Sequence, residues 1–303
     1  LPGGKAQRQL TTVKVVDLPL WIGAPAQLAL EKGYFADAGL DVKLSYIAAP
    51  SVAIAGLASG AYDIYGTCGM TTAAVANLGG VGMKFIAPAG ATAPGVQATI
   101  VLKTSTITSR KQLQGKTIAV NSIGGSAQQI AMQFIRNGGV DPKNNTWVPI
   151  PATGMQQALE TGRIDAASAF PQPQLGAALK TGKFRVVGDD SLSAGPYGTM
   201  TSGWCASNRF IDGNPDAVKA YVSAIMKAQK YARTHKQEAK LQVLKYTAVT
   251  RDQALAAKIG NYATAIQLKR GQGQLDSAYK SGLLAQPFDF KSIVWSGAPT
   301  INN

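Results

Sequence analysis

An internal repeat of about 100 residues constrains the fold of this chain more than any other feature of its sequence. The stretch 57–63 reads LASGAYD and the stretch 159–165 reads LETGRID. Upstream, AGLD at 38–41 matches GGVD at 138–141 with nearly the same offset. A period this long is typical of duplication of a whole lobe and not of a solenoid. We therefore expect two lobes of shared topology.

Each repeat alternates short β-like runs with helical patterns, an order that is typical of parallel βαβ units. In the first repeat we expect strands over 13–16, 42–47, 62–66 and 83–87. In the second repeat we expect strands over 98–103, 117–121, 146–150 and 164–169. The sequence therefore predicts an α/β fold of two lobes, each a mostly parallel sheet flanked by helices.

The last hundred residues become helical after one more β-like run over 197–206. In the helix that follows, Val218, Tyr221 and Ile225 place apolar side chains on one face, which must pack on another part of the protein. The simplest partner is the first lobe. We predict that lobe 1 comprises 1–100 and 202–303 and that lobe 2 comprises 101–201. Strands near 98–103 and 197–206 would then cross between the lobes as a hinge.

The charge balance of the chain is strongly basic, with 30 Lys and Arg against 16 Asp and Glu. Basic residues such as Lys219, Lys230 and Arg233 fall on the polar face of a predicted helix, without a basic run interleaved with aromatic residues. This pattern favours a solvated surface over a nucleic-acid site. Long-range attraction of an anionic ligand and a docking surface are the remaining alternatives.

The apolar runs of the chain are all shorter than the ~20 residues that span a bilayer. Its start has no apolar stretch of a signal peptide and no cysteine that would take a lipid. We therefore expect either the mature form of an exported protein or a cytosolic protein, free in solution.

Several motifs resemble those of one transport family. The segments PAQLALEKGYF at 25–35 and AGLDV at 38–42 resemble the opening motif of nitrate/taurine/sulfonate-type substrate-binding proteins of ABC transporters. The segments 57–63, 113–120 and 159–166 resemble later landmarks of that family. The resemblance implies a type II periplasmic-binding fold, export to the periplasm, and delivery of a ligand to a permease with its ATPase. We further expect a monomer that needs no cofactor.

Ligands of open parallel sheets bind beyond the carboxyl ends of the strands, where loops enter helices. This rule selects the loops 17–22, 67–71, 121–127 and 170–172, none of which contains Lys or Arg. An anionic group there would be held by backbone N–H groups and hydroxyls. The candidate ligand-binding residues, with two added from the return across the hinge, are Asp17, Trp21, Ile22, Thr67, Cys68, Gly69, Ser122, Gly124, Gly125, Ser126, Phe170, Gln172, Tyr197 and Trp204.

Two of these loops are rich in glycine, which lets backbone N–H groups approach a ligand at the mouth of a helix. An anionic group gains about 0.3–1 kcal/mol at such a mouth; the alternative is a turn without a ligand. Asp17 either pairs with a ligand amine or caps the next helix. The aromatic candidates either form flat walls for an organic ligand or belong to the core. Together they favour a small organic ligand, such as a sulfonate, a carboxylate or an aromatic acid, over an inorganic ion.

Cys68 and Cys205 are the two cysteines of the chain, and both fall at strand ends near the predicted cleft. In an oxidising compartment a disulfide between them is one alternative. The other is a pair of buried thiols that pack as small hydrophobic side chains.

An enzyme is the main alternative class, because pyrimidine synthases of thiamine biosynthesis resemble this fold and some of these turns. The resemblance would require an internal His, a reactive Lys and a Cys cluster for iron. This chain has a single His, His235, in a basic segment, and no clustered Cys. The GKT sequence at 115–117 resembles the end of a phosphate-binding loop, but Arg110 stands where its first glycine belongs. We expect neither catalytic nor metal-ligating residues, and a periplasmic sensor domain remains a third alternative.

Overall fold

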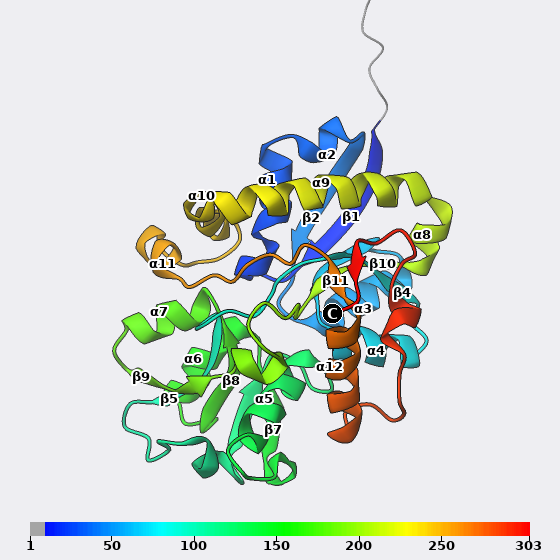
Figure 1. Ribbon diagram of the computed structural model, residues 1–303. Helices are drawn as coiled ribbons and strands as arrows, with labels where there is room; N and C mark the ends of the chain where they lie inside the picture. The colour runs from blue at the N-terminus through cyan, green and yellow to red at the C-terminus, as the bar shows by residue number, and fades with distance from the viewer. Residues whose placement is uncertain (1–9) are drawn as a thin grey trace, which may run out of the picture.

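Two five-stranded sheets form the centres of two lobes in the computed structural model, which describes residues 10–303 (Figure 1). The first sheet contains β1 (Thr11–Asp17), β2 (Leu40–Tyr46), β3 (Ile64–Cys68), β4 (Met83–Pro88) and β10 (Gly203–Ser207). The second contains β5 (Gln97–Leu102), β6 (Thr117–Val120), β7 (Thr146–Pro149), β8 (Ala166–Pro171) and β9 (Phe184–Asp189). Of these strands, β9 is the one that the sequence pattern did not indicate.

The two sheets have the same strand order. The first runs β2-β1-β3-β10-β4 and the second runs β7-β6-β8-β5-β9, so each position in one sheet has a counterpart in the other. In each sheet one strand is antiparallel to both of its neighbours, namely β10 in the first sheet and β5 in the second. The predicted two-lobed α/β fold with mostly parallel sheets is confirmed.

The aspartates that mark the internal repeat make the same contacts in both lobes. Asp63 Oδ2 accepts a hydrogen bond from Lys14 N at 2.8 Å, and Asp165 Oδ2 accepts one from Thr117 N at 2.8 Å. The N–H groups of the two aspartates donate back to the carbonyl oxygens of Lys14 and Thr117, both at 2.8 Å. Each aspartate therefore ties the start of one central strand to its parallel neighbour, which helps to fix their register.

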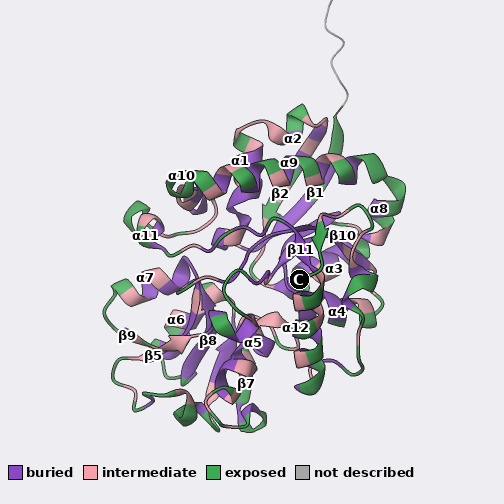
Figure 2. Cartoon of the chain, viewed as in Figure 1, coloured by how far each residue is buried: buried purple, intermediate pink, exposed green. Residues whose placement is uncertain are grey.

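Helices cover both faces of each sheet (Figure 1), and the strands between these layers consist largely of buried residues (Figure 2). On the first sheet, one face carries α1 (Ala24–Glu31), α2 (Tyr34–Asp37), α8 (Asn208–Gly213) and α9 (Pro215–Thr234). The other face carries α3 (Pro50–Ser59), α4 (Met70–Leu78) and α12 (Leu268–Lys280). On the second sheet, α5 (Ser126–Arg136) lies opposite α6 (Ala152–Glu160) and α7 (Gln174–Lys180).

Short elements complete the described part of the chain. They are the helices α10 (Lys236–Leu241) and α11 (Arg251–Ala256), the 3-10 turns η1 (Trp21–Gly23), η2 (Arg110–Leu113), η3 (Pro142–Asn144), η4 (Ser191–Ala194), η5 (Gln242–Lys245) and η6 (Phe290–Ile293), and the strand pair β11 (Ile266–Gln267) and β12 (Thr300–Ile301).

Helix α9 brings the chain back onto the first lobe. Its apolar stripe is buried, with Val218, Tyr221 and Ile225 all 0% exposed. The ring of Tyr221 stacks on that of Phe35 in α2, with 5.1 Å between the ring centroids. The stripe that the sequence placed on one helix face is thus covered by the first lobe.

Two chain segments join the sheets, namely residues 89–96 between β4 and β5 and residues 190–202 between β9 and β10. They lie against each other as an antiparallel pair, because Ala89 N donates to Ser202 O at 2.9 Å and Thr92 N donates to Thr199 O at 2.8 Å. The strand expected over 98–103 is β5, which lies wholly inside the second sheet, and the run expected over 197–206 is a strand only from Gly203. The segments that cross between the two sheets therefore precede both strands.

Candidate ligand-binding site

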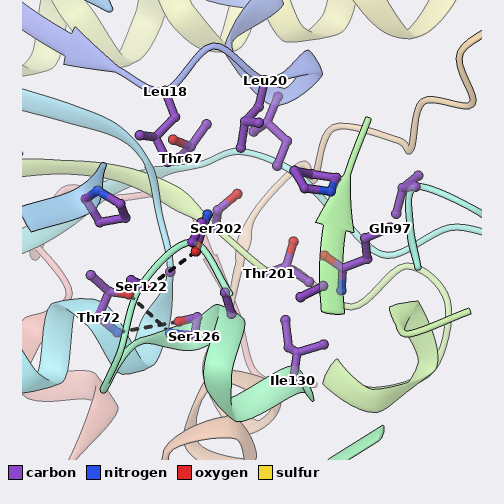
Figure 3. Close-up of a pocket in the computed structure, with 18 of the residues that line it drawn as sticks. Leu18, Leu20, Thr67, Thr72, Gln97, Ser122, Ser126, Ile130, Thr201 and Ser202 are labelled. Atoms are coloured by element: carbon purple, nitrogen blue, oxygen red, sulfur yellow. Dashed lines mark hydrogen bonds between the residues drawn. The ribbon is translucent and has the colours of Figure 1, made fainter. Parts of the chain in front are cut away.

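A cavity of about 90 Å³ lies between the two lobes, beneath the crossing segments (Figure 3). The first lobe contributes the ends of β1 and β3, and the second contributes the start of α5 and the end of β8. Of the residues that the structure describes, none that lines the cavity is charged. The lining residues are Leu18, Leu20, Trp21, Ile22, Pro50, Tyr65, Thr67, Gly69, Thr72, Ala91, Thr92, Val96, Gln97, Asn121, Ser122, Ser126, Ala127, Ile130, Ala169, Pro171, Thr201 and Ser202.

The cavity brings together a little under half of the residues selected from the sequence. Those that line it are Trp21, Ile22, Thr67, Gly69, Ser122 and Ser126. Those that do not are Asp17, Cys68, Gly124, Gly125, Phe170, Gln172, Tyr197 and Trp204. The loops that follow β1, β3 and β6 therefore supply the site, as the rule for parallel sheets predicts.

Asp17 lies behind the cavity wall and does not reach the cavity. Its side chain is 0% exposed, and its Oδ1 accepts hydrogen bonds from Leu18 N and from Thr67 Oγ1, both at 2.8 Å. It does not cap the helix that follows, because η1 begins after Leu20 and has no side-chain cap. Burial raises the pKa of the Asp17 carboxyl to about 7, against the opposing effect of its two hydrogen bonds. Asp17 therefore lies behind the cavity wall and holds two residues that line it, Leu18 and Thr67, by hydrogen bonds.

The aromatic candidates other than Trp21 lie away from the cavity. Trp204 is 0% exposed and meets the Tyr221 ring edge-on, with 5.8 Å between centroids, in the layer between the first sheet and α9. Phe170 is buried in the core of the second lobe. Tyr197 is 45% exposed on the surface. For Trp204 in β10 and Phe170 in β8, strand alternation explains the position, since successive side chains of a strand point to opposite faces.

Gln172 and the two glycines of the second-lobe loop have other surroundings. The Gln172 side chain donates to Gly95 O at 3.1 Å and accepts from Gly176 N at 3.1 Å, so both ends of its amide are engaged. Gly124 and Gly125 face a separate apolar groove between α3 and the loop 121–125. These residues shape the loops around the cavity and do not line it.

Cys68 and Cys205 are free thiols in this structure, both 0% exposed in the same hydrophobic cluster. Burial raises the pKa of the Cys205 thiol well above its usual value, and a hydrogen bond with Cys68 raises it further. Of the two alternatives left open by the sequence, the structure thus contains the pair of buried thiols.

The mouths of two helices, α4 in the first lobe and α5 in the second, face each other across the cavity edge (Figure 3). Ser126 Oγ accepts hydrogen bonds from Thr71 N at 3.1 Å and from Thr72 N at 3.4 Å. In return, Ser126 N donates to Thr72 Oγ1 at 3.2 Å. Three backbone amides at these helix mouths are therefore hydrogen-bonded to hydroxyls of the facing lobe.

Two residues in the left-handed region lie at equivalent positions of the repeat, and both line the cavity. They are Thr67 in β3, with φ of 52°, and Ala169 in β8, with φ of 49°. Each is bound to a buried carboxyl, since Thr67 Oγ1 donates to Asp17 and Ala169 N donates to Asp190 Oδ2 at 2.6 Å. Burial raises the pKa of Asp190 to about 7 as well. A left-handed non-glycine residue is costly unless its surroundings hold it, and these carboxyls do so.

Sequence reasoning missed the contribution of the crossing segments. Ala91, Thr92, Val96 and Gln97 line the cavity from the first crossing, and residues 201–202 line it from the second. The predicted first crossing began at residue 98 and so left out residues 91–97, and from the predicted second crossing, 197–206, only Tyr197 and Trp204 were selected. A signal was nevertheless present, because a chain that passes twice between two lobes must run along the cleft between them.

The described residues contain no group of His, Cys, Asp or Glu side chains arranged to hold a metal ion. Among the same residues, no helix is long and apolar enough to cross a bilayer. His235 is exposed at the end of α9, where its ring stacks on that of Tyr231 with 3.8 Å between centroids.

Comparisons with known proteins agree with this two-lobed fold. The family model described as NMT1/THI5 like matches residues 24–239, more than half of the chain. The chain belongs to the NMT1/THI5-like family. A comparison with curated protein sequences finds no match.

Solved structures share the fold of this NMT1/THI5-like protein at low sequence identity. The alkanesulfonate-binding protein SsuA from Xanthomonas axonopodis pv. citri, bound to MOPS, gives a TM-score of 0.79 at 15% identity, covering 95% of this chain and 99% of its own. The periplasmic nitrate-binding protein NrtA from Synechocystis PCC 6803 gives 0.78 at 17%, covering 94% and 85%. The ligand-binding component of an ABC-type import system from Staphylococcus aureus, with zinc bound, gives 0.80 at 15%, covering 94% and 96%.

These three similar structures are, by name, ligand-binding proteins and not enzymes. The resemblance to nitrate- and sulfonate-type substrate-binding proteins that the motifs indicated is therefore confirmed.

Proposed function

We propose that this protein is the extracytoplasmic solute-binding protein of an ABC importer, which captures a small organic molecule between its lobes and presents it to a permease with its ATPase. The observation that carries the proposal is the enclosed cavity between two duplicated sheets, at the point where two chain segments cross. A site divided between two lobes suits reversible capture, because separation of the lobes opens it. Periplasmic localisation and a monomeric state belong to this proposal.

The contacts between the lobes support capture by closure. Besides the bonds between Ser126 and the start of α4, Gln174 Nε2 of the second lobe donates to Pro19 O of the first at 3.1 Å. Gln129 Nε2 likewise donates to Gln274 O at 3.3 Å. Further bonds join α5 to residues 277–281, from Arg136 Nη1 to Ser281 Oγ at 3.0 Å and from Ser277 Oγ to Gln133 Oε1 at 3.4 Å. A bound ligand that adds contacts to both lobes would shift the population further toward the closed form.

The chemistry of the cavity wall supports binding over catalysis. Its polar groups are hydroxyls, amides and a phenol, with no carboxylate, imidazole, lysine or thiol among the described lining residues. General acid–base and nucleophilic catalysis need such groups within reach of the reacting atoms. The cavity therefore offers recognition without a catalytic group.

The size of the cavity restricts the ligand. An apolar cavity of about 150 Å³ takes up benzene, and this one measures about 90 Å³ in the closed arrangement. We therefore propose a molecule of a few heavy atoms, or a larger one of which only one end is enclosed. Small sulfonates and carboxylates belong in the test set because proteins of this fold bind alkanesulfonate and nitrate by name.

The test combines calorimetry with small-angle scattering. Small sulfonates, aliphatic and aromatic carboxylates, their amides, pyrimidines and amines are titrated into the protein, and each compound that binds is examined for compaction. We expect at least one class to bind and to reduce the radius of gyration. Absence of binding across the panel, with no compaction, would contradict capture by closure.

A further inference from the structure

The interior of the cavity is uncharged in a protein whose net charge is strongly positive. The chain carries 30 Lys and Arg against 16 Asp and Glu, yet the described residues that line the cavity include no ionisable group except the phenol of Tyr65. A carboxylate or sulfonate enclosed there would lose its hydration without gaining a cation in exchange. The basic surface thus acts on the ligand only from a distance, where water and salt screen it.

Three of the backbone donors at the helix mouths, which could compensate for a missing cation, are already engaged. The amides at the mouth of α4 donate to Ser126 Oγ, and the Ser126 amide at the mouth of α5 donates to Thr72 Oγ1. An anionic group would have to displace these hydroxyls and separate the two helices to reach the same donors. The closed arrangement therefore favours a ligand that leaves the helix mouths as they are.

Four of the eight hydroxyl groups of the wall donate their hydrogen to the protein. Thr67 Oγ1 donates to Asp17, Thr92 Oγ1 to Pro196 O at 2.8 Å, Thr201 Oγ1 to Gly90 O at 3.3 Å, and Ser122 Oγ to Asn121 Oδ1 at 3.3 Å. These four hydroxyls therefore face a ligand as acceptors and not as donors.

Gln97 has a buried side-chain donor without a partner in the described part of the chain. Its side chain lines the cavity at the start of β5, and Figure 3 shows it turned toward the side on which Thr201 lies. Its Nε2 is buried and has no hydrogen-bond partner within residues 10–303. Other buried side-chain atoms of residues 10–303 also lack a hydrogen-bond partner, but their residues do not line the cavity. Buried amide groups are rarely left unpaired, so an unpaired one at the wall of a cavity indicates where a ligand atom binds.

From these contacts we infer that the ligand is an uncharged small molecule with a carbonyl-type acceptor, such as a carboxamide or sulfonamide, and that Gln97 is the residue that selects it. A primary amide carries a donor and an acceptor side by side, which is the pattern that complements the Gln97 amide. Leu18, Leu20, Trp21 and Ile130 would enclose its apolar part. This inference rests on the proposed function and adds to it the class of ligand.

The decisive experiment compares acids with amides of the same shape. Methanesulfonate with methanesulfonamide, isobutyrate with isobutyramide, and benzoate with benzamide form pairs that differ in charge at nearly constant volume. At pH 7 and fixed ionic strength, we expect calorimetry to show that the amide of at least one pair binds tenfold or more tightly than its acid. Tighter binding of the acids, or equal binding of both members, would overturn the inference and leave the solute-binding function standing. If no member of any pair binds, the inference fails, and the wider panel above then decides separately on the proposed function.

A variant of Gln97 separates selection from folding. Gln97→Met keeps the length of the side chain and removes the unpaired amide, so its ligand-free thermal midpoint should equal or exceed that of the wild type, while its affinity for the amide falls tenfold or more. The control is Gln157→Met, which makes the same change at an exposed position of α6 in the same lobe and should alter neither quantity. Unchanged amide affinity in Gln97→Met would overturn the role of Gln97. A lowered midpoint with a matching loss of affinity would assign Gln97 to the scaffold instead.

Discussion

Ser126 and Thr72 cap each other's helices across the boundary between the lobes. Ser126 N donates to Thr72 Oγ1 at 3.2 Å, and Thr72 N donates to Ser126 Oγ at 3.4 Å. The residues in the N-cap positions of these helices are Gly69 and Gly125, which have no side chain for the task. Each hydroxyl thus accepts a hydrogen bond from a first-turn amide of the facing helix, as the side chain of an N-cap residue normally does within its own helix.

Replacement of Ser126 should act on closure and leave folding intact. In Ser126→Ala the amides of Thr71 and Thr72 lose their acceptor only in the closed form, because water satisfies them when the lobes separate. Loss of an N-cap costs about 1 kcal/mol, so we expect ligand affinity to fall about fivefold and the thermal midpoint to stay unchanged. Isothermal calorimetry and thermal unfolding check this, with Ser223→Ala on the exposed side of α9 as the control. An equal loss of stability and affinity would contradict it.

Gly69→Ala should hold the lobes apart. A Cβ at this position would lie 2.6 Å from Ser126 Cβ of the facing lobe and closer still to its hydroxyl. The φ of Gly69 is −83°, which alanine adopts freely, so the strain appears only on closure. We expect a larger radius of gyration in small-angle scattering, at least tenfold weaker ligand binding, and an unchanged midpoint. The control Gly213→Ala adds a methyl group to open space and should change none of these; closure at wild-type dimensions in Gly69→Ala would refute the packing argument.

The buried carboxyls should make stability fall as pH rises from about 4 to 7. Burial raises the pKa of Asp17 and of Asp190 from 3.8 to about 7, so between these values the folded protein holds protons that the unfolded chain has released. The unfolding free energy therefore decreases with pH across this window and levels off above it. No salt bridge to either residue occurs within residues 10–303.

Asp17→Asn tests this dependence, because the single bonded oxygen of Asp17, Oδ1, is retained in asparagine. One pKa unit corresponds to about 1.4 kcal/mol, so the variant should gain up to a few kcal/mol over the wild type at pH 8 and nothing at pH 4. Urea unfolding from pH 4 to 8 measures it, with the exposed Asp216→Asn as control. Parallel stability curves for Asp17→Asn and wild type would show that Asp17 does not titrate in this range.

The equivalent aspartates of the repeat should contribute differently to the free energy of unfolding. Asp63 and Asp165 make the same backbone bond, but Asp63 is 8% exposed whereas Asp165 lies at the surface. Removal of a partner from a buried donor costs about 1–3 kcal/mol, whereas water replaces an exposed one. We expect Asp63→Ala to lower the unfolding free energy by that amount and Asp165→Ala by less than about 1 kcal/mol. Equal losses in urea titrations would mean that the burial of the bond is unimportant.

The two thiols should be present and protected. A thiol reagent should label neither Cys68 nor Cys205 in the folded protein, since both are fully buried, and should label two groups per chain in denaturant without reductant. Absence of labelling in denaturant would establish a disulfide between them. Cys205→Ala should be tolerated with a loss of about 1–2 kcal/mol, because a buried thiol packs as a small hydrophobic group.

The fold was readable from the sequence because its determinants are local and repeated. The Gly of the LASGAYD and LETGRID stretches ends a helix, and the Asp fixes the start of a strand. Both roles follow from the residue type and its local spacing. Strand β9 has no counterpart among these motifs, and its residues are mostly half-buried without alternation, whereas β8 is buried throughout.

Among the residues selected from the sequence, those that line the cavity follow strand ends. Trp21, Thr67 and Ser126 were selected by that rule, whereas Gln97 was not, because its place in the cavity wall depends on where the chain crosses between the lobes. Asp190 was missed for a related reason. Its contact with Ala169 joins the loop after β9 to the end of β8, a tertiary relationship that neither periodicity nor spacing expresses.

The strand order also has a consequence for the assembly of the molecule. All five strands of the second sheet come from residues 97–189, whereas β4 of the first sheet is held beside β3 only by β10, which begins at Gly203. The N-terminal lobe therefore cannot complete its sheet until the middle of the chain has passed through the second lobe and returned. The part that begins the chain finishes folding last, with β4 as an unpaired edge in the meantime.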